Sequence, residues 1–251
     1  MIELENVCAG YNGKTVIKNI SLKFPMGKLI SVIGPNGSGK TTLLKAVAGL
    51  LPVSDGKIII DGTNRAAMNR RETARKIAYL AQGRSTPDMT AGQLALHGRF
   101  PHLGYPRTYS ESDRHIASDA LAHMGISDHA ATPLSELSGG MRQNAFIAMA
   151  LAQDTDYILL DEPTTYLDIS NQLGVIKTLR SLANDGKGIV SVIHDLPLAF
   201  TFSDIIAVVV DGSILLQDTP EKVFESNVIK SVFGAELSFC TNGKFYYYNM
   251  F

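Results

Sequence analysis

A glycine-rich stretch near the start of the sequence constrains the fold more than any other feature. Residues 34–42 read GPNGSGKTT and match the pattern G-x-x-x-x-G-K-[ST] of a phosphate-binding loop. The preceding residues, 28–33, form a short apolar run that predicts a buried strand. Apolar residues at helical spacing follow the loop, between Leu43 and Leu51. A strand, a glycine loop and a helix in this order are the context in which such a loop binds phosphate.

The residue types of this loop suit a polyphosphate. Glycines let the backbone curl until several N–H groups point at one anion, and the following helix adds the positive end of its dipole. Lys40 is expected to reach the β- and γ-phosphates of a nucleotide, and the Thr41 hydroxyl to ligate Mg²⁺. The predicted nucleotide ligands are Gly34, Asn36, Gly37, Ser38, Gly39, Lys40, Thr41 and Thr42. The alternative, a glycine-rich turn that matches by chance, is disfavoured by the predicted flanking strand and helix.

Composition narrows the class of protein. The 251 residues are 45% hydrophobic and 19% charged, which is ordinary for a globular chain, and a net charge of −1 argues against a dedicated nucleic-acid binder. Cys8 and Cys240 are too few for a disulfide framework. Residues 1–5 lack the basic head and apolar core of a signal peptide, and the apolar runs are too short to span a bilayer. We therefore expect a cytosolic chain that reaches a membrane only through a partner.

Apolar strands that alternate with helices predict an α/β fold with a parallel sheet covered on both faces. Predicted strands cover 2–8, 15–24, 28–33, 57–62, 77–80, 157–160, 188–193, 205–210 and 213–217. Predicted helices cover 70–76, 93–97, 110–124, 141–153, 170–184 and 196–202. The first strands form a small antiparallel lobe. We expect one domain over 1–251, with a helical subdomain at about 84–153 inserted into a nucleotide-binding core made of 1–83 and 154–251.

Two acidic residues follow a predicted buried strand. Asp161 and Glu162 come directly after Tyr157–Leu160, at the carboxyl end of a parallel strand, where α/β sheets bind ligands. Asp161 is placed to hold Mg²⁺, and Glu162 to accept a proton from an attacking water. The alternative, two acids that only end a strand before a turn, is disfavoured beside a phosphate loop.

A second glycine turn opens a later helix. Residues 137–140 read LSGG, and by the same backbone argument they predict a second phosphate site. The alternative is an ordinary helix start in which Ser138 caps the first turn. One chain rarely needs two such loops for one nucleotide.

These motifs together resemble the nucleotide-binding subunit of an ATP-binding cassette (ABC) transporter over nearly the whole chain. LSGG is the signature of that family and lies, as here, between its two nucleotide motifs. The resemblance implies a P-loop NTPase core that uses ATP and Mg²⁺. It also implies a head-to-tail pair with a second copy or a homologous ATPase, in which Ser138, Gly139 and Gly140 close on the ATP held by the other subunit.

Four further positions take roles that the resemblance implies. Gln82 matches the glutamine that contacts Mg²⁺ and senses the permease, and Asp168 matches the acid of the D-loop. His194 matches the switch histidine on the γ-phosphate, and Tyr11 the aromatic that stacks on adenine. Taken singly, Tyr11 is explained as well by packing and His194 as a histidine at a strand end. Their order and spacing favour the family roles.

Two positions depart from the usual pattern of the family. Met141 stands where Gln or Glu is common, and Asn144 where Arg is frequent. These changes affect the side-chain part of the contact with the other subunit's ATP, whereas the Ser138 hydroxyl and the glycine backbone remain.

Within the family, the chain is most similar to ATPases of iron-siderophore, haem and cobalamin importers. The similarity rests on two strings, HGRFPH at 97–102 and DEPTTYLD at 161–168. A metal site is the alternative reading of His97 and His102. The similarity implies an ATP-hydrolysing subunit on the cytoplasmic face of the membrane, coupled to permease subunits and indirectly to an extracytoplasmic substrate-binding protein. A soluble ABC ATPase of cofactor assembly and an exporter ATPase are the alternatives.

The stretch at 83–109 is the expected permease contact. It is loop-rich, and loops of such length inside a compact domain are usually functional. Its apolar side chains include Met89, Phe100, Leu103 and Tyr105, set among arginines as interface anchors often are. The alternative is that these side chains only pack the helical subdomain.

Overall fold

A six-stranded sheet forms the centre of the computed structural model, which describes residues 1–83, 85–165, 167–241 and 245–249. Its order is β10-β9-β3-β8-β7-β6, and every neighbouring pair is parallel except β10 with β9. The strands are β3 Leu29–Ile33, β6 Ile77–Leu80, β7 Tyr157–Asp161, β8 Gly188–Val192, β9 Ile205–Val210 and β10 Ser213–Asp218. The expected α/β fold is confirmed.

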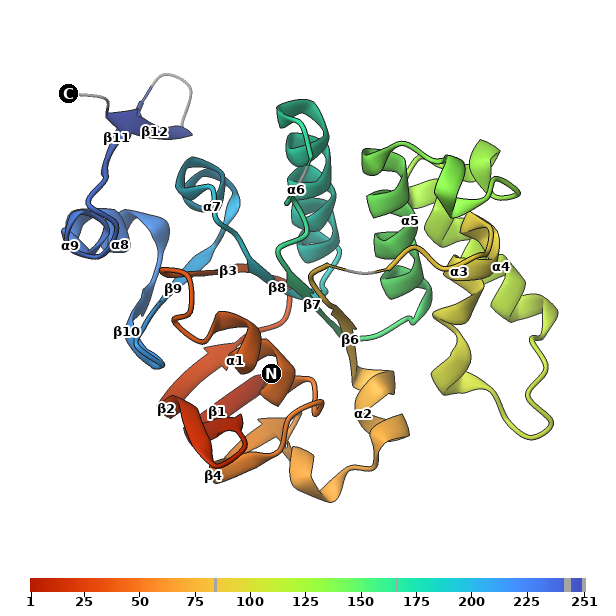
Figure 1. The fold of residues 1–251 in the computed structure, drawn as a ribbon, viewed down its shortest axis with the longest axis horizontal. Helices are drawn as coiled ribbons and strands as arrows, with labels where there is room; N and C mark the ends of the chain where they lie inside the picture. Colours follow the sequence, from red (N-terminus) through yellow and green to blue (C-terminus); the bar gives the residue numbers. More distant parts are fainter. Residues whose placement is uncertain (84, 166, 242–244, 250–251) are drawn as a thin grey trace.

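Both faces of this sheet are buried. Alternate residues of each strand point to opposite faces, so each strand contributes to two apolar cores. On β3, Leu29 and Ile33 join the core beneath the helices α6 (Ile169–Asn184) and α7 (Leu196–Phe202). Ile30 and Val32 join a second core, shared with the antiparallel sheet and the helix α1 (Lys40–Val47). Figure 1 shows α6 and α7 on one side of the sheet and α1 on the other. Fully buried parallel strands explain why the sequence reads as continuous apolar runs.

The antiparallel lobe is a four-stranded sheet in the order β2-β1-β4-β5. Its strands are β1 Ile2–Tyr11, β2 Lys14–Phe24, β4 Val53–Ile60 and β5 Thr63–Asn64. The strand predicted at 57–62 begins four residues earlier, because Val53 and Asp55 pair with Ala9 and Cys8 of β1. The register shifts there, and Gly56 has φ +79°. A bulge of this kind keeps a turn-forming sequence in the sheet.

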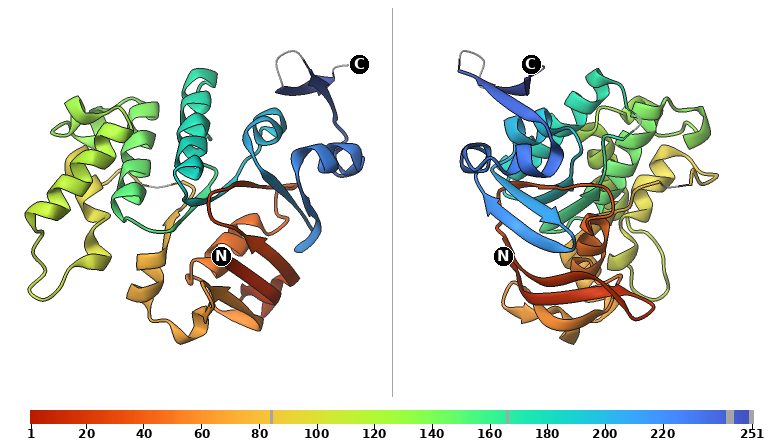
Figure 2. Two further views of the ribbon diagram at one scale, coloured as in Figure 1. Left: turned by 180° about the vertical axis from the view of Figure 1, so that it is seen from behind. Right: turned by 60° about the vertical axis from the view of Figure 1, so that its left-hand side comes forward.

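Between residues 85 and 152, the described elements are helices and short 3-10 turns. They are α3 Ala91–His97, α4 Glu111–His123, α5 Gly139–Ala152 and the turns Phe100–His102, Ser127–His129 and Leu134–Glu136. Figure 2 shows these helices, in yellow and green, grouped at one end of the molecule. Ser110 begins α4 in a capping box with Asp113. The helix α5 begins two residues before its predicted start, because Ser138 accepts a hydrogen bond from the Met141 N–H.

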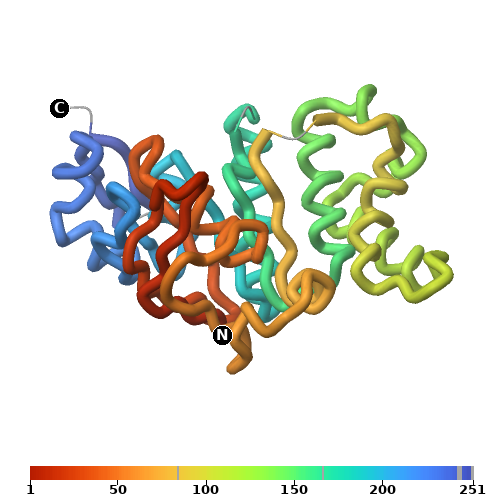
Figure 3. Tube along the Cα trace, turned by 60° about the horizontal axis from the view of Figure 1, so that its bottom comes forward, coloured from red at the N-terminus to blue at the C-terminus, as the bar shows by residue number. Residues whose placement is uncertain are grey.

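The remaining described elements lie before and after these helices. They are the turn Arg65–Ala67, α2 Arg70–Lys76, α8 Pro220–Glu225, α9 Val228–Phe233, β11 Glu236–Cys240 and β12 Phe245–Asn249. The C-terminal four were not predicted. The strand β12 packs on α7 through Tyr246, whose ring meets Phe200, Phe224 and Phe239 edge-on or tilted. Figure 3 shows this C-terminal part, in blue, at the end opposite the helices α3–α5. No helix in the described ranges is long and apolar enough to cross a membrane.

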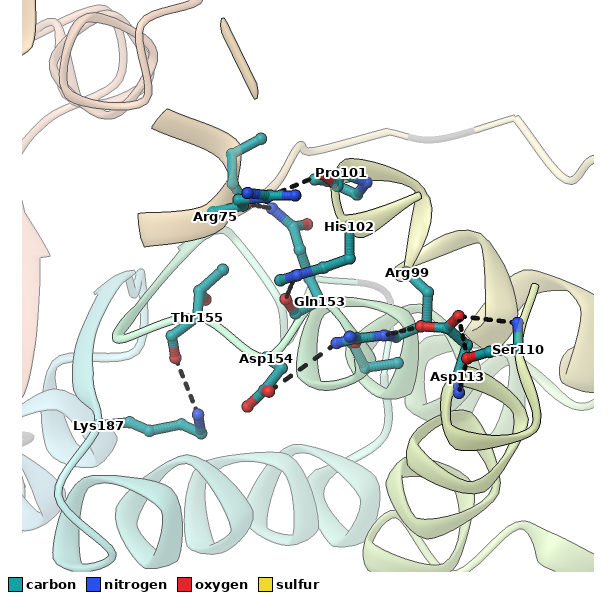
Figure 4. Close-up of polar contacts among 12 residues, drawn as sticks. Arg75, Arg99, Pro101, His102, Ser110, Asp113, Gln153, Asp154, Thr155 and Lys187 are labelled. Atoms are coloured by element: carbon teal, nitrogen blue, oxygen red, sulfur yellow. Dashed lines mark hydrogen bonds and ion pairs between the residues drawn. The ribbon is translucent and has the colours of Figure 1, made fainter. Parts of the chain in front are cut away.

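A polar cluster, formed by Arg99, His102 and Asp113 with their partners, ties residues 99–102 to the helices around them (Figure 4). The Arg99 guanidinium is buried, and donates to Asp113 Oδ1 at 3.0 Å and to the Ala152 carbonyl at 2.9 Å. His102 Nε2 lies 2.8 Å from the Gln153 carbonyl and donates to it. Hydrogen bonds from Ser110 and from Arg99 lower the pKa of Asp113 to about 2. The cluster therefore holds the C-terminal end of α5.

The same segment is also bound by α2. The Pro101 carbonyl accepts hydrogen bonds from Arg71 Nε at 2.8 Å and from Arg75 Nε at 3.1 Å. The metal-site alternative for His97 and His102 gains no support, because the described residues contain no group of three or more metal-binding side chains. The contacts of His102 instead give it a structural role.

Candidate active site

One cavity, of about 790 Å³, gathers most of the predicted site residues at the carboxyl ends of β3, β6, β7 and β8. The residues that line it are Tyr11, Val16, Asn36, Gly37, Gly39, Lys40, Thr41, Thr42, Gln82, Glu162, Thr165 and His194. Gly34 and Ser38 belong to the same loop but do not line the cavity. Asp161 lies directly behind it, in contact with Thr41. This is the edge of a parallel sheet at which ligands bind.

The loop from β3 to α1 depends on glycine at two points. Gly39 begins α1 at φ +103°, and Gly34 has φ +157°. A Cβ at Gly34 would lie 2.1 Å from the Val209 carbonyl oxygen, so no side chain fits there. Ser38 is buried, and its Oγ has no hydrogen-bond partner among the described residues. Gly34 therefore lets the loop run close against β9.

Lys40 is held against the loop that carries it. Its side chain is buried, and Nζ donates to the carbonyls of Gly34 and Pro35 at 2.9 Å each. Burial lowers the pKa of Lys40, and the nearby charges of Glu162 and Asp161 oppose that shift. A buried ammonium between carbonyls and carboxylates is the charge that a polyphosphate needs.

The Asp161 carboxylate is fixed by two hydroxyls. Oδ1 accepts from Thr41 Oγ1 at 3.1 Å, and Oδ2 accepts from the Tyr79 hydroxyl at 3.2 Å. Burial raises the pKa of Asp161, and these two hydrogen bonds lower it. Hydroxyl and carboxylate oxygens are the donors that Mg²⁺ prefers, and this ion is usually held by one or two carboxylates plus substrate phosphates. Asp161 and Thr41 fit such an ion.

Glu162 is the point at which the predicted catalytic residues meet. Its Oε1 lies 2.6 Å from His194 Nε2, and its Oε2 accepts from Gln82 Nε2 at 2.6 Å. Thr165 Oγ1 also donates to Oε2, at 3.0 Å. Glu162 has φ +53°, a conformation that is uncommon outside glycine and often found at functional sites. The side chains that follow β6, β7 and β8 therefore converge on one carboxylate.

The LSGG residues and Asp168 do not line this cavity. Asp168 begins α6 and accepts from the Asn171 N–H and from Asn171 Nδ2, both at 2.8 Å. A Cβ added at Gly140 would lie 2.6 Å from Asn171 Oδ1, so Asn171 packs closely between Asp168 and Gly140. Gly139 lines an adjoining cavity of about 250 Å³, together with Gln82 and Glu162. Ser138 caps α5, as the alternative reading required.

The two unusual residues near the signature have contacts within the chain. Met141 packs partly buried against the large apolar core, and Asn144 Nδ2 donates to the Met124 carbonyl at 3.2 Å. Tyr166, part of the DEPTTYLD string, lies outside the described residues.

The comparisons with known proteins agree with this geometry. A family model described as ABC transporter matches residues 17–165. This chain belongs to the ABC transporter family. It is 39% identical to the petrobactin import ATP-binding protein FpuD of Bacillus anthracis, over 97% of this chain and 90% of that protein. It is 36% identical to the ferric enterobactin transport ATP-binding protein FepC of Escherichia coli K12, over 92% of this chain and 86% of that protein.

Solved structures extend the likeness to the fold. The dimeric post-hydrolysis structure of the ATP-binding cassette MJ0796 bound to ADP and Pi aligns with a TM-score of 0.77 and 29% identity. The alignment covers 88% of this chain and 99% of the MJ0796 chain. The chain is therefore an ABC ATPase, which binds and hydrolyses ATP. The expected family is confirmed.

Several site residues of this ABC ATPase were not predicted. Thr165, Tyr79 and Asn171 each contact a predicted residue, and Val16 lines the cavity. Thr165 follows Glu162 by only three residues, so its contact with Glu162 could have been predicted from the sequence. Tyr79 and Val16 lie on other strands, and only the pairing of those strands brings them to the site.

Proposed function

We propose that this ABC ATPase powers the import of an iron-siderophore or a related metal chelate. The observation that carries the catalytic part is the convergence of Gln82, Thr165 and His194 on Glu162 beside the phosphate loop. The substrate class rests on the named roles of the relatives in petrobactin import and ferric enterobactin transport.

The reaction is phosphoryl transfer to water, in which catalysis consists mainly of positioning and charge stabilisation. Lys40 balances the charge of the β- and γ-phosphates, and Tyr11 stacks on the adenine. Glu162 accepts a proton from the attacking water, while His194 holds Oε1 and contacts the γ-phosphate. Thr41, Gln82 and Asp161 would hold Mg²⁺, which when bound would supply positive charge to the phosphate oxygens.

Two chains share each ATP in this proposal. Ser138, Gly139, Gly140 and Asp168 lie outside the cavity of their own chain, which suits a role at the ATP of a partner. The partner is a second copy or a homologous ATPase, and ATP closes the pair head to tail. The start of α5 supplies N–H groups for the γ-phosphate. Hydrolysis then reopens the pair.

A groove of about 670 Å³ between α2 and residues 100–107 is the proposed permease contact. It is lined by Arg70, Arg71, Ala74, Phe100, Pro101, Leu103, Gly104, Tyr105 and Arg107. The Tyr105 side chain is almost fully exposed, and the Arg107 guanidinium lies 4.8 Å from the centre of the half-exposed Phe100 ring. Aromatic and arginine side chains are the usual anchors of interfaces.

The other two apolar residues expected there are covered rather than exposed, although Leu103 also lines the groove. Leu103 is buried, and Met89 packs against the apolar core. For these two, packing of the helices is the better account. The occupant that we propose for the groove is a cytoplasmic segment of the permease. Residues 84–153 act as the helical subdomain that carries most of this contact, within one nucleotide-binding domain.

This docking places the chain on the cytoplasmic face of the membrane. A substrate-binding protein on the other side delivers the chelate to the permease and does not contact the ATPase. The near-neutral charge of the chain gives no reason to expect nucleic acid as a partner.

A cross-linking experiment tests the proposed function. In a chain with Cys8→Ser and Cys240→Ser, a cysteine replaces the exposed Ser85 or Thr86. It should cross-link to a cytoplasmic loop of the cognate permease in membranes, with a yield that changes with nucleotide. The matched control is Ser112→Cys, an exposed position on α4.

The proposal is wrong if membranes that carry the cognate permease neither retain this chain nor change its rate of ATP hydrolysis. A soluble role in cofactor assembly would then be favoured. Equal cross-linking from Ser112→Cys would show collision without docking.

A further inference from the structure

The side chain of Tyr79 crosses from one strand to the acidic end of the next. The strands β6 and β7 are parallel, and Tyr79 lies opposite Leu159. Side chains two residues apart on a strand share a face, so Leu159 and Asp161 point to the same side of the sheet. Tyr79 packs against the core on that side, to which Leu159 belongs. Its hydroxyl can therefore reach forward to Asp161, and it lies 3.2 Å from Oδ2.

The two oxygens of Asp161 are bound from different directions. Thr41, from the phosphate loop, donates to Oδ1, and Tyr79, from the sheet, donates to Oδ2. The terminal torsion of an aspartate is soft, and its carboxylate turns easily unless it is held. Two donors on opposite oxygens fix that torsion. The Tyr79 donor is a rigid ring on a strand of the central sheet.

We propose that Tyr79 is a positioning residue of the hydrolysis site, whose hydroxyl holds Asp161 in the orientation that Mg²⁺ bound with ATP requires. The proposal rests on the function proposed above, in which Asp161 and Thr41 hold that ion. Mg²⁺ demands near-ideal octahedral geometry, so a misdirected carboxylate weakens its binding. Hydrogen-bond partners of metal ligands commonly contribute 10–100-fold to metal affinity or activity.

The test is Tyr79→Phe, which removes the hydroxyl and leaves the ring. Mn²⁺ serves as the probe, because it binds carboxylate and hydroxyl oxygens as Mg²⁺ does and is visible by electron paramagnetic resonance. In the presence of ATP, the affinity of the full chain for Mn²⁺ should fall on the order of 10-fold. The affinity for ATP measured in EDTA should stay unchanged, since Tyr79 does not line the nucleotide cavity.

The chain offers a matched control in Tyr157. This residue also lies on a strand of the central sheet, and its hydroxyl also donates to a carboxylate at 3.2 Å, that of Asp61. Asp61 lies outside the cavity, so Tyr157→Phe removes the same kind of bond without touching the predicted metal ligands. This variant should keep the Mn²⁺ affinity of the wild-type chain.

Each outcome decides the proposal. A loss of Mn²⁺ affinity in Tyr79→Phe alone supports it. An unchanged Mn²⁺ affinity in Tyr79→Phe overturns it, and so does an equal loss in both variants, which would show a general effect on the sheet. If the wild-type chain binds ATP but takes up no Mn²⁺ with it, the proposed metal site itself is wrong, and the role of Tyr79 falls with it.

Discussion

Replacing Asp113 with asparagine removes the negative charge that faces the buried Arg99. The wild-type carboxylate accepts hydrogen bonds from the Ser110 N–H and hydroxyl and from Arg99. These contacts lower its pKa from 3.8 to about 2. One pKa unit corresponds to about 1.4 kcal/mol, so the ionised form contributes about 2 kcal/mol to the free energy of unfolding at neutral pH.

The loss in Asp113→Asn should be somewhat larger than this value. The variant leaves the Arg99 guanidinium buried, with Asp154 as its next acidic neighbour at 3.9 Å. Removing one partner of a buried ion pair costs about 3–5 kcal/mol. Because Asp154 is largely exposed, we expect a loss of about 2–4 kcal/mol at pH 7. Equilibrium unfolding in urea, followed by circular dichroism, measures it.

The sign of the pH dependence gives a second check. A carboxyl whose folded pKa is lowered stabilises the protein above its unfolded pKa, here 3.8, and the contribution disappears as the pH falls toward 2. The stability difference between wild type and Asp113→Asn should therefore be constant from pH 7 to 5 and shrink below about pH 4. Glu111→Gln removes an exposed charge from the same helical turn and serves as the control. A loss below about 0.5 kcal/mol at pH 7, no greater than for this control, would refute the reasoning.

Three further predictions concern the site. Glu162→Gln should bind ATP with Mg²⁺ but hydrolyse it roughly 10²–10⁴-fold more slowly and accumulate an ATP-bound dimer, and near-normal turnover would exclude Glu162 as the general base. Lys40→Ala should abolish ATP binding, whereas Ser138→Arg should keep it and block dimer closure. A mixture of these two inactive variants should then regain some hydrolysis, and normal hydrolysis by a Ser138→Arg monomer would contradict a shared site. Gly140→Ala should change the free energy of unfolding by less than about 1 kcal/mol, because the atoms that its Cβ would approach belong to the end of the exposed Asn171 side chain, which can move aside. Gly174→Ala, in open space on α6, should stabilise the chain, and a loss above about 2 kcal/mol for Gly140→Ala in a urea series would contradict this reasoning.

Local patterns in the sequence predicted much of the fold because the responsible interactions lie close in the chain. The bounds of α2, β6, α7 and β9 match the structure residue for residue. Caps and apolar runs define such elements without help from distant residues. The paired strand at 53–56 was missed, because only β1 holds that turn-like sequence extended. The C-terminal elements were missed for a related reason, since short segments such as β12 are stabilised by packing on α7.

The same distinction holds for the site. The phosphate-loop pattern predicted Lys40, the acidic end of a buried strand predicted Glu162, and the family resemblance implied His194; the structure brings all three to one cavity. No spacing rule indicates that Tyr79 contacts Asp161, because that contact depends on how β6 lies beside β7. The contact of Ser138 with the ATP of a second subunit stays a prediction. It depends on a surface that one chain cannot display alone.

Side-chain hydrogen bonds hold both ends of the helix α5. Ser138 caps its first turn, and the carbonyls at its last turn accept from Arg99 and His102, in the segment that borders the groove. Fourteen helical residues make a rod about 21 Å long that does not bend easily. A tilt of about 10° around its C-terminal end would move Ser138 by roughly 4 Å, farther than the length of a hydrogen bond. A displacement at the groove that is too small to unfold the chain would therefore produce a larger displacement of Ser138, at the far end of α5.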